Sequence, residues 1–150
     1  VNMNDLKKNT PFMRWIIEFA EEKIVEDRLI KEKFNSHDEF IIFTIIWLRV
    51  YKHIFKIIKS ENSNLNFDKY LKDFYYNQQH KYLGITINAL TRESEIPRST
   101  VKRIVENLIS KNLVSRNLNR LIIPTSKVRD TMSKYRKYTL KTHKKLFDLF

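Results

Sequence analysis

The chain is poor in the residues that interrupt helices and in those that form covalent or metal links. Its 150 residues include no cysteine, one glycine and three prolines. The absence of cysteine excludes disulfides and thiolate metal sites, and a single glycine excludes the glycine-rich loops that cradle phosphates in many nucleotide-binding proteins. So few turn-forming residues also favour long helices over a fold rich in strands. We therefore predict a mainly α-helical protein.

Long hydrophobic runs are missing as well. The longest apolar stretch, Phe40 to Leu48, is interrupted by Thr44 and is far shorter than the roughly 20 residues that cross a bilayer. The first residues, VNMNDLKKNTPF, lack the apolar core and cleavage site of a signal peptide. These absences predict a cytoplasmic protein with no membrane partner.

No group of residues suggests catalysis or metal binding. The four histidines lack the spacing of a metal site, and no nucleophile stands with a base and an orienting acid. We therefore expect no enzyme activity, no metal and no cofactor. The histidines are His37, His53, His80 and His143.

The positive charge of the chain is concentrated in its second half. Residues 1–80 hold 13 Lys and Arg against 12 Asp and Glu, a net charge of +1, whereas residues 81–150 hold 16 against 5, a net charge of +11. A basic surface binds polyanions through counterion release. Charge alone does not distinguish DNA from RNA or from an anionic lipid surface.

Two helices are predicted in the N-terminal region, residues 1–60, which we expect to serve packing or dimerisation. The first, at 10–34, begins with a Thr-Pro pair that matches an N-cap and first helical residue. The second, at 36–59, opens with the capping box S-H-D-E. Aromatic residues at helical spacing indicate a packed core, with a small-molecule effector pocket as the alternative. They are Phe12, Trp15, Phe40, Phe43, Trp47 and Tyr51.

A third helix is predicted at 67–83, after a polar connector. The only glycine, Gly84, stands where a left-handed helix cap is expected. A short strand at 85–87 would then lead into a short helix, for which Thr86 or Asn88 is the N-cap.

The next segment predicts a turn at 94–97 and a longer helix at about 98–111. This helix is apolar on one face only, at the i, i+3, i+4, i+7 spacing of a helix packed on one side. The apolar residues are Val101, Ile104, Val105 and Leu108, and the opposite face shows Arg98, Ser99, Lys102 and Arg103. A helix that is packed on one face and cationic on the other is suited to the major groove of DNA.

A β-hairpin is predicted after this helix. Asn112 stands at a left-handed C-cap. Two short strands, 113–116 and 120–123, would enclose the loop 117–119, and Pro124 would end the second strand.

The final helix, within residues 126–150, has an alternating spacing of 4 and 3 that is typical of a coiled-coil seam. The seam residues are Val128, Met132, Tyr135, Thr139, Thr142, Leu146 and Leu149. A dimerisation helix and a helix that lies on its own domain both fit this pattern.

Residues 85–125 resemble the winged-helix bacterial transcription regulators, most closely those of the multiple-antibiotic-resistance regulator (MarR) type. The resemblance rests on the segment NALTRESEIPRSTVKRIVENLISKNLVSR. It implies a winged helix-turn-helix domain at 67–125, with a three-helix core and a small β-hairpin wing, additional N-terminal helices and a long C-terminal helix. It also implies a homodimer formed by the terminal helices. The chain departs from the family pattern at Glu95 and Asn112, where glycine is common, and in its shorter wing loop.

The candidate DNA-binding residues lie on the predicted recognition helix, at the N-cap of the short helix before it, and on the wing. Groups at the start of a helix bind phosphates, and we assign such contacts to Ser99 and Thr100. Arginine facing guanine is the commonest specific contact. We assign contacts with base edges or nearby phosphates to Arg98, Lys102 and Arg103. The remaining candidates are Thr86, Arg116, Asn117, Asn119 and Arg120, for whose hairpin a merely solvated role is the alternative.

These features predict a double-stranded DNA-binding transcription regulator, more specifically a repressor. One alternative is a winged-helix replication initiator of plasmid or phage type. A second is a winged-helix protein-interaction module, for which an acidic or apolar recognition face would be expected. RNA binding also stays open, although the helix lacks the stacking aromatic residues typical of single-strand readers.

Overall fold

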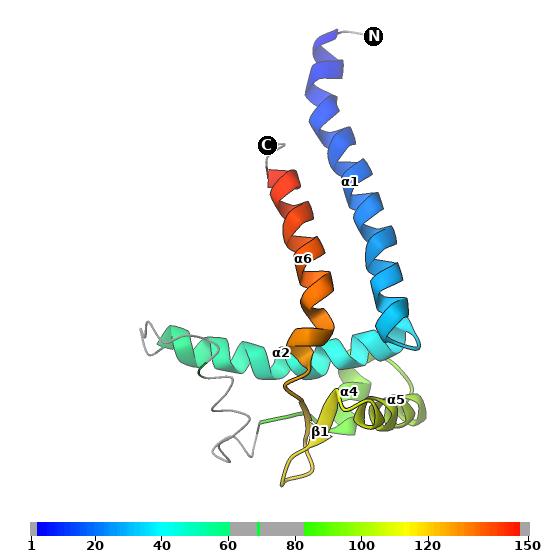
Figure 1. Ribbon diagram of the computed structural model, residues 1–150, viewed down its shortest axis with the longest axis vertical. Coiled ribbons are helices and arrows are strands. Elements are labelled where there is room, and N and C mark those ends of the chain that lie inside the picture. Colours follow the sequence, from blue (N-terminus) through cyan, green and yellow to red (C-terminus); the bar gives the residue numbers. More distant parts are fainter. Residues whose placement is uncertain (1–2, 61–68, 70–82, 148–150) are drawn as a thin grey trace. The chain divides into compact units, whose positions relative to one another are not determined.

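The computed structural model describes residues 3–60, 69 and 83–147 (Figure 1). These residues are mainly helical and include one two-stranded antiparallel sheet, as the composition predicted. The chain divides into two compact units, one holding residues up to Asn35 and from Asp130, the other Ser36–Arg129. No helix in the described part is long and apolar enough to cross a membrane. The third helix predicted at 67–83 lies outside the described residues, apart from Lys69 and Leu83.

The first unit contains α1 (Met3–Lys33) and most of α6 (Val128–Phe147). Helix α1 begins at Met3 rather than at Thr10 and passes through Pro11. A proline inside a helix removes one backbone donor, so here the Thr-Pro pair interrupts the hydrogen bonding without ending the helix. Of the predicted seam of α6, Val128 is buried and Met132 is half-buried.

Aromatic rings stack along α1, with ring centroids 6.1 Å apart for Phe12 and Trp15 and 5.4 Å apart for Trp15 and Phe19. The core packing predicted for this helix is wrong for Phe12, which is 56% exposed, and Phe19 is 42% exposed. Helical spacing predicts that such residues share a face but does not tell whether the same chain covers that face.

In the second unit, α2 (His37–Ser60) packs against α4, α5 and β2. Its backbone begins as predicted, because the Ser36 hydroxyl accepts a hydrogen bond from the Glu39 N–H at 3.1 Å. The sequence predicts this helix as part of the N-terminal region 1–60, whereas its apolar face belongs to the core of the unit Ser36–Arg129. The buried residues of that face are Ile42, Phe43, Ile46, Val50 and Ile54.

Helix α4 (Ile87–Ser94) is capped by Thr86, whose Oγ1 accepts a hydrogen bond from the Ala89 N–H at 3.1 Å. The prediction of a strand at 85–87 is wrong beyond its first residue. Only Ile85 forms a β-bridge, an isolated one with Ile122. The chain turns into α4 immediately after Ile85, because Thr86 supplies the cap.

Gly84 does not adopt the left-handed cap predicted for it, since its φ is 147°. A Cβ atom at this position would lie 2.6 Å from the Leu121 Cβ. Glycine is therefore required here by the close approach of the chain to the hairpin, together with the positive φ.

The predicted turn and longer helix are confirmed. Glu95 is left-handed, with φ 58° and ψ 19°, and α5 (Arg98–Ser110) follows it. Val101, Val105 and Leu108 of α5 are fully buried, and Ile104 is nearly so. Asn112 takes the expected left-handed conformation, with φ 60°.

The hairpin consists of β1 (Val114–Arg116) and β2 (Ile122–Pro124). Val114 pairs with Pro124 and Arg116 with Ile122. The second strand is therefore shifted from the predicted 120–123: Arg120 lies in the loop and Pro124 continues the strand. The shift arises because the loop is longer than predicted, with Asn117 paired to Leu121 across it.

Candidate nucleic-acid interface

Helix α5 presents a cationic outer face. Its four buried apolar residues hold one side of the helix against the rest of the unit, which leaves Arg98, Ser99, Lys102 and Arg103 exposed and Thr100 half-buried. This is the arrangement predicted from the sequence. No carboxylate within the described ranges forms an ion pair with Lys102 or Arg103. The helix therefore carries uncompensated positive charge on a face that nothing in its own unit buries.

Arg98 is oriented by a neighbour on α4. Its Nε donates a hydrogen bond to the Asn88 side-chain oxygen at 3.0 Å. Asn88 was considered in the sequence only as an alternative cap for α4, and the structure gives that role to Thr86. The bond limits the directions in which the Arg98 guanidinium can point, while the residue stays exposed and its side chain has further N–H donors.

Thr86, another predicted DNA contact, is exposed at the start of α4. Its Oγ1 already accepts the capping hydrogen bond from Ala89. A hydroxyl has one donor as well, so the same side chain can cap the helix and donate to a phosphate.

The hairpin is tied to the outer face of α5 by an ion pair. Arg116 Nη2 of β1 lies 2.8 Å from Glu106 Oε1 of α5, and both side chains are partly exposed, at 38% and 66%. Glu106 was not identified from the sequence, because only the folded hairpin brings it beside Arg116. Part of the Arg116 charge is therefore compensated within the protein.

Asn117 organises the hairpin loop. Its Oδ1 accepts hydrogen bonds from the N–H groups of Asn119 and Leu121, each at 3.0 Å, and its Nδ2 donates to the Leu83 carbonyl at 3.1 Å. Asn119 and Arg120, by contrast, are exposed. Of the three predicted loop contacts, Asn117 uses its side chain within the fold, while the other two side chains face outward.

The C-terminal end of α5 is held by a buried carboxylate on α2. Glu39, whose side chain is only 2% exposed, accepts hydrogen bonds from Lys111 Nζ at 2.5 Å and from Asn107 Nδ2 at 3.2 Å. A buried charge is tolerated only where partners of this kind compensate it. The contact fixes how α5 sits on α2, and hence where its cationic face lies.

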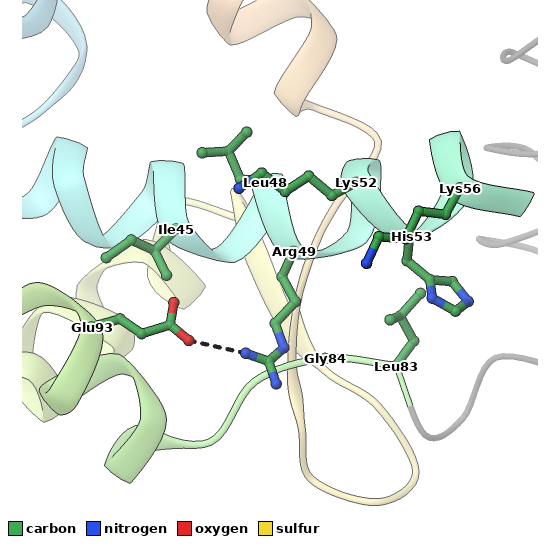
Figure 2. Close-up of a pocket in the computed structure, with 9 residues that line it drawn as sticks. All are labelled: Ile45, Leu48, Arg49, Lys52, His53, Lys56, Leu83, Gly84 and Glu93. Carbon is green, nitrogen blue, oxygen red and sulfur yellow. Dashed lines mark hydrogen bonds and ion pairs between the residues drawn. The ribbon is translucent and has the colours of Figure 1, made fainter. Parts of the chain in front are cut away.

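A cavity of about 610 Å³ opens on the same unit between α2 and α4 (Figure 2). Figure 2 shows the ion pair of Arg49 and Glu93 across it, at 3.0 Å. Lys52 and Lys56 of α2 add positive charge to its wall. None of the six aromatic residues considered for an effector pocket lines it. The lining residues are Ile45, Leu48, Arg49, Lys52, His53, Lys56, Leu83, Gly84 and Glu93.

The described residues contain no group of three or more His, Cys, Asp and Glu side chains that could hold a metal ion. No family model matches the chain, and neither a curated protein nor a solved structure matches it.

Proposed function

We propose that the unit Ser36–Arg129 is a winged helix-turn-helix domain that binds double-stranded DNA, with α5 as its recognition helix in the major groove. In this proposal α2 and α4 support α5, and the hairpin β1–β2 is the wing. This arrangement is the one expected from the resemblance of the sequence to the MarR-type regulators.

The observation that carries the proposal is the uncompensated cationic face of α5. Arg98, Lys102 and Arg103 lie on the side of the helix opposite the buried stripe. The major groove admits an α-helix and offers guanine edges that arginine recognises with two hydrogen bonds. The short side chain of Ser99 lets the start of the helix approach phosphates closely.

The proposal includes a homodimer, because α1 exposes large apolar side chains along much of its length. Contiguous exposed apolar surface marks interaction sites in folded proteins. A second copy of the chain is the partner that a palindromic DNA site would require. The side chains that are more than half exposed are Phe12, Met13, Ile17 and Ile24.

As a function we propose transcription regulation, specifically repression, by a cytoplasmic protein that is not an enzyme. A replication initiator with the same DNA-binding unit is the second candidate, since the basic face of α5 supports DNA binding equally in both. The basic face favours either of them over a protein-interaction module.

Selection from fragmented genomic DNA of the native host tests this function. Purified protein is mixed with the fragments at moderate salt, and bound DNA is sequenced. We expect enrichment of inverted repeats upstream of genes, whereas enrichment at a replication origin would favour the initiator. The double variant Lys102→Ala, Arg103→Ala is the control. Equal recovery with wild type and variant, or no enrichment with either, would contradict the proposal.

A further inference from the structure

A hydrogen bond joins the first residue of α5 to a side chain of α4. Arg98 Nε donates to Asn88 Oδ1 at 3.0 Å, across ten residues of sequence. The oxygen is the only acceptor of the Asn88 amide, so the bond also fixes which way the amide faces. No other hydrogen bond or ion pair of Arg98 occurs in the described part of the chain. The guanidinium is therefore held at one nitrogen only.

The bond determines which donors of Arg98 stay available. A guanidinium carries five N–H groups in a planar fork, one on Nε and two on each Nη. Such a fork meets a pair of acceptors either side-on, through Nε and one Nη, or end-on, through both Nη atoms. Because Asn88 takes the Nε proton, the end-on pair remains for a ligand.

The other cations of this surface are arranged differently. Arg116 is held by its Nη2, which lies 2.8 Å from the Glu106 carboxylate, so the end of its fork already faces an anion. Lys102 and Arg103 have no hydrogen-bond or ion-pair partner in the described ranges, so nothing holds their direction. Among the described cations of α5 and β1, Arg98 is the one that is held while both terminal nitrogens stay free.

Asn88 stands on a rigid support. It lies in the first turn of α4, which Thr86 caps, and α4 packs against α5. The turn between the two helices is closed by Ser94, whose Oγ donates to the Leu90 carbonyl at 2.6 Å and accepts from the Ile96 N–H at 3.2 Å. A side chain that is held by a fixed neighbour loses less conformational freedom when it binds.

We propose that Arg98 reads a guanine of the DNA site end-on, and that Asn88 is the positioning residue that makes this reading selective. The inference rests on the proposed DNA binding by α5. Guanine presents O6 and N7 as two neighbouring acceptors in the major groove, which match the two terminal nitrogens of Arg98. Lys102 and Arg103, which no neighbour holds, contribute affinity through phosphates, and such contacts carry no sequence information.

A phosphate would also fit the fork of Arg98, since it offers two oxygens as well. The position of Arg98 favours a base edge, because the N-terminal residues of a recognition helix are those that contact bases. The Asn88 bond favours a base edge too. Attraction to a phosphate depends mainly on charge, whereas two parallel hydrogen bonds to a flat base edge depend on the direction of the guanidinium plane.

Guanine analogues in a duplex that the wild type selects from genomic DNA test the proposal. Each guanine is replaced singly by 7-deazaguanine, which lacks the N7 acceptor, and by hypoxanthine, which keeps O6 and N7 but lacks the minor-groove amino group. Fluorescence anisotropy measures the affinities of the wild type, Asn88→Ala, Arg98→Ala and the double variant. Asn88→Asp, which keeps the acceptor oxygen, is the conservative variant.

At one guanine position of the site, we expect 7-deazaguanine to lower the wild-type affinity by about tenfold and hypoxanthine to leave it nearly unchanged. Asn88→Ala should reduce this loss without changing the salt dependence, since it removes no charge. Asn88→Asp should keep the loss, although its added negative charge weakens binding overall. Arg98→Ala should abolish the loss, and adding Asn88→Ala to it should change nothing further, because Asn88 acts through Arg98.

The outcomes separate this inference from the proposed function. A wild type that binds no duplex overturns both. A wild type that binds in a salt-dependent way but tolerates 7-deazaguanine at every position overturns the reading of guanine alone and would place Arg98 on a phosphate. A loss that is equally large in the wild type and in Asn88→Ala overturns the positioning role of Asn88.

Discussion

Glu39 and Lys111 form an ion pair of 2.5 Å between α2 and the residue that ends α5. The carboxylate side chain is 2% exposed and the lysine side chain 28%, so the pair reaches from the core to the surface. Because Glu39 also accepts a hydrogen bond from Asn107, it holds two points on the last turn of α5. The orientation of the proposed recognition helix depends on this contact.

Replacing Lys111 by alanine should lower the free energy of unfolding by about 3 kcal/mol, because it leaves the buried Glu39 carboxylate without its cation. Urea unfolding measures the change. The matched control is Glu93→Ala, which breaks the exposed pair with Arg49 in the same unit and should cost less than about 1 kcal/mol. Equal losses for the two variants would show that the pair of Glu39 and Lys111 is not a structural anchor.

Thr86→Ala should cost about 1 kcal/mol of stability, since it removes the side-chain cap of α4. Thr86→Ser keeps an oxygen in the same place and should restore most of that loss. Thermal unfolding of both variants measures the effect. If alanine and serine behave alike, the capping hydrogen bond does not contribute as the geometry implies.

Glu95→Gly should stabilise the protein by up to about 1 kcal/mol, because Glu95 holds a left-handed backbone that glycine adopts without strain. Asn112→Gly, at the other left-handed helix end, should change stability little, since asparagine tolerates this conformation. Chemical denaturation compares them. A destabilised Glu95→Gly variant would mean that the glutamate side chain contributes more than its backbone costs.

The exposed apolar side chains of α1 predict self-association. We expect the wild type to sediment as a dimer at micromolar concentration, and the variant Ile17→Glu, Ile24→Glu to sediment as a monomer, since charges are poorly tolerated in the core of an interface. Arg14→Glu, an exposed change of charge on the same helix, should remain dimeric. A monomeric wild type would remove the dimer from the proposal and leave DNA binding by the second unit intact.

Local signals made much of the second unit predictable from the sequence. The apolar stripe of α5 needs only the helical period, and the caps at Thr86 and Asn112 depend on side chains next to the helix ends. The exposed cationic face then follows, because burying the stripe turns its opposite side outward.

The parts that sequence did not predict depend on distant contacts or on closure of the hairpin. The capping box explains the backbone contact of Glu39, yet its carboxylate meets Lys111, 72 residues away in the sequence. The hairpin register was misplaced because the side chain of Asn117 bridges a longer loop. Gly84 looked like a helix cap, but the nearby Leu121 decides its conformation.

Salt-dependent binding to duplex DNA tests the central claim, that the outer face of α5 binds DNA. Fluorescence anisotropy is recorded with the selected duplex from low to moderate salt for the wild type, Lys102→Ala, Arg103→Ala and the exposed control Lys33→Ala. The account predicts that affinity falls steeply and linearly with salt on a logarithmic scale. The slope should become shallower by about 1 for each α5 variant whose side chain contacts a phosphate and stay unchanged for Lys33→Ala. Binding that ignores salt, or α5 variants that bind as the wild type does, would contradict it.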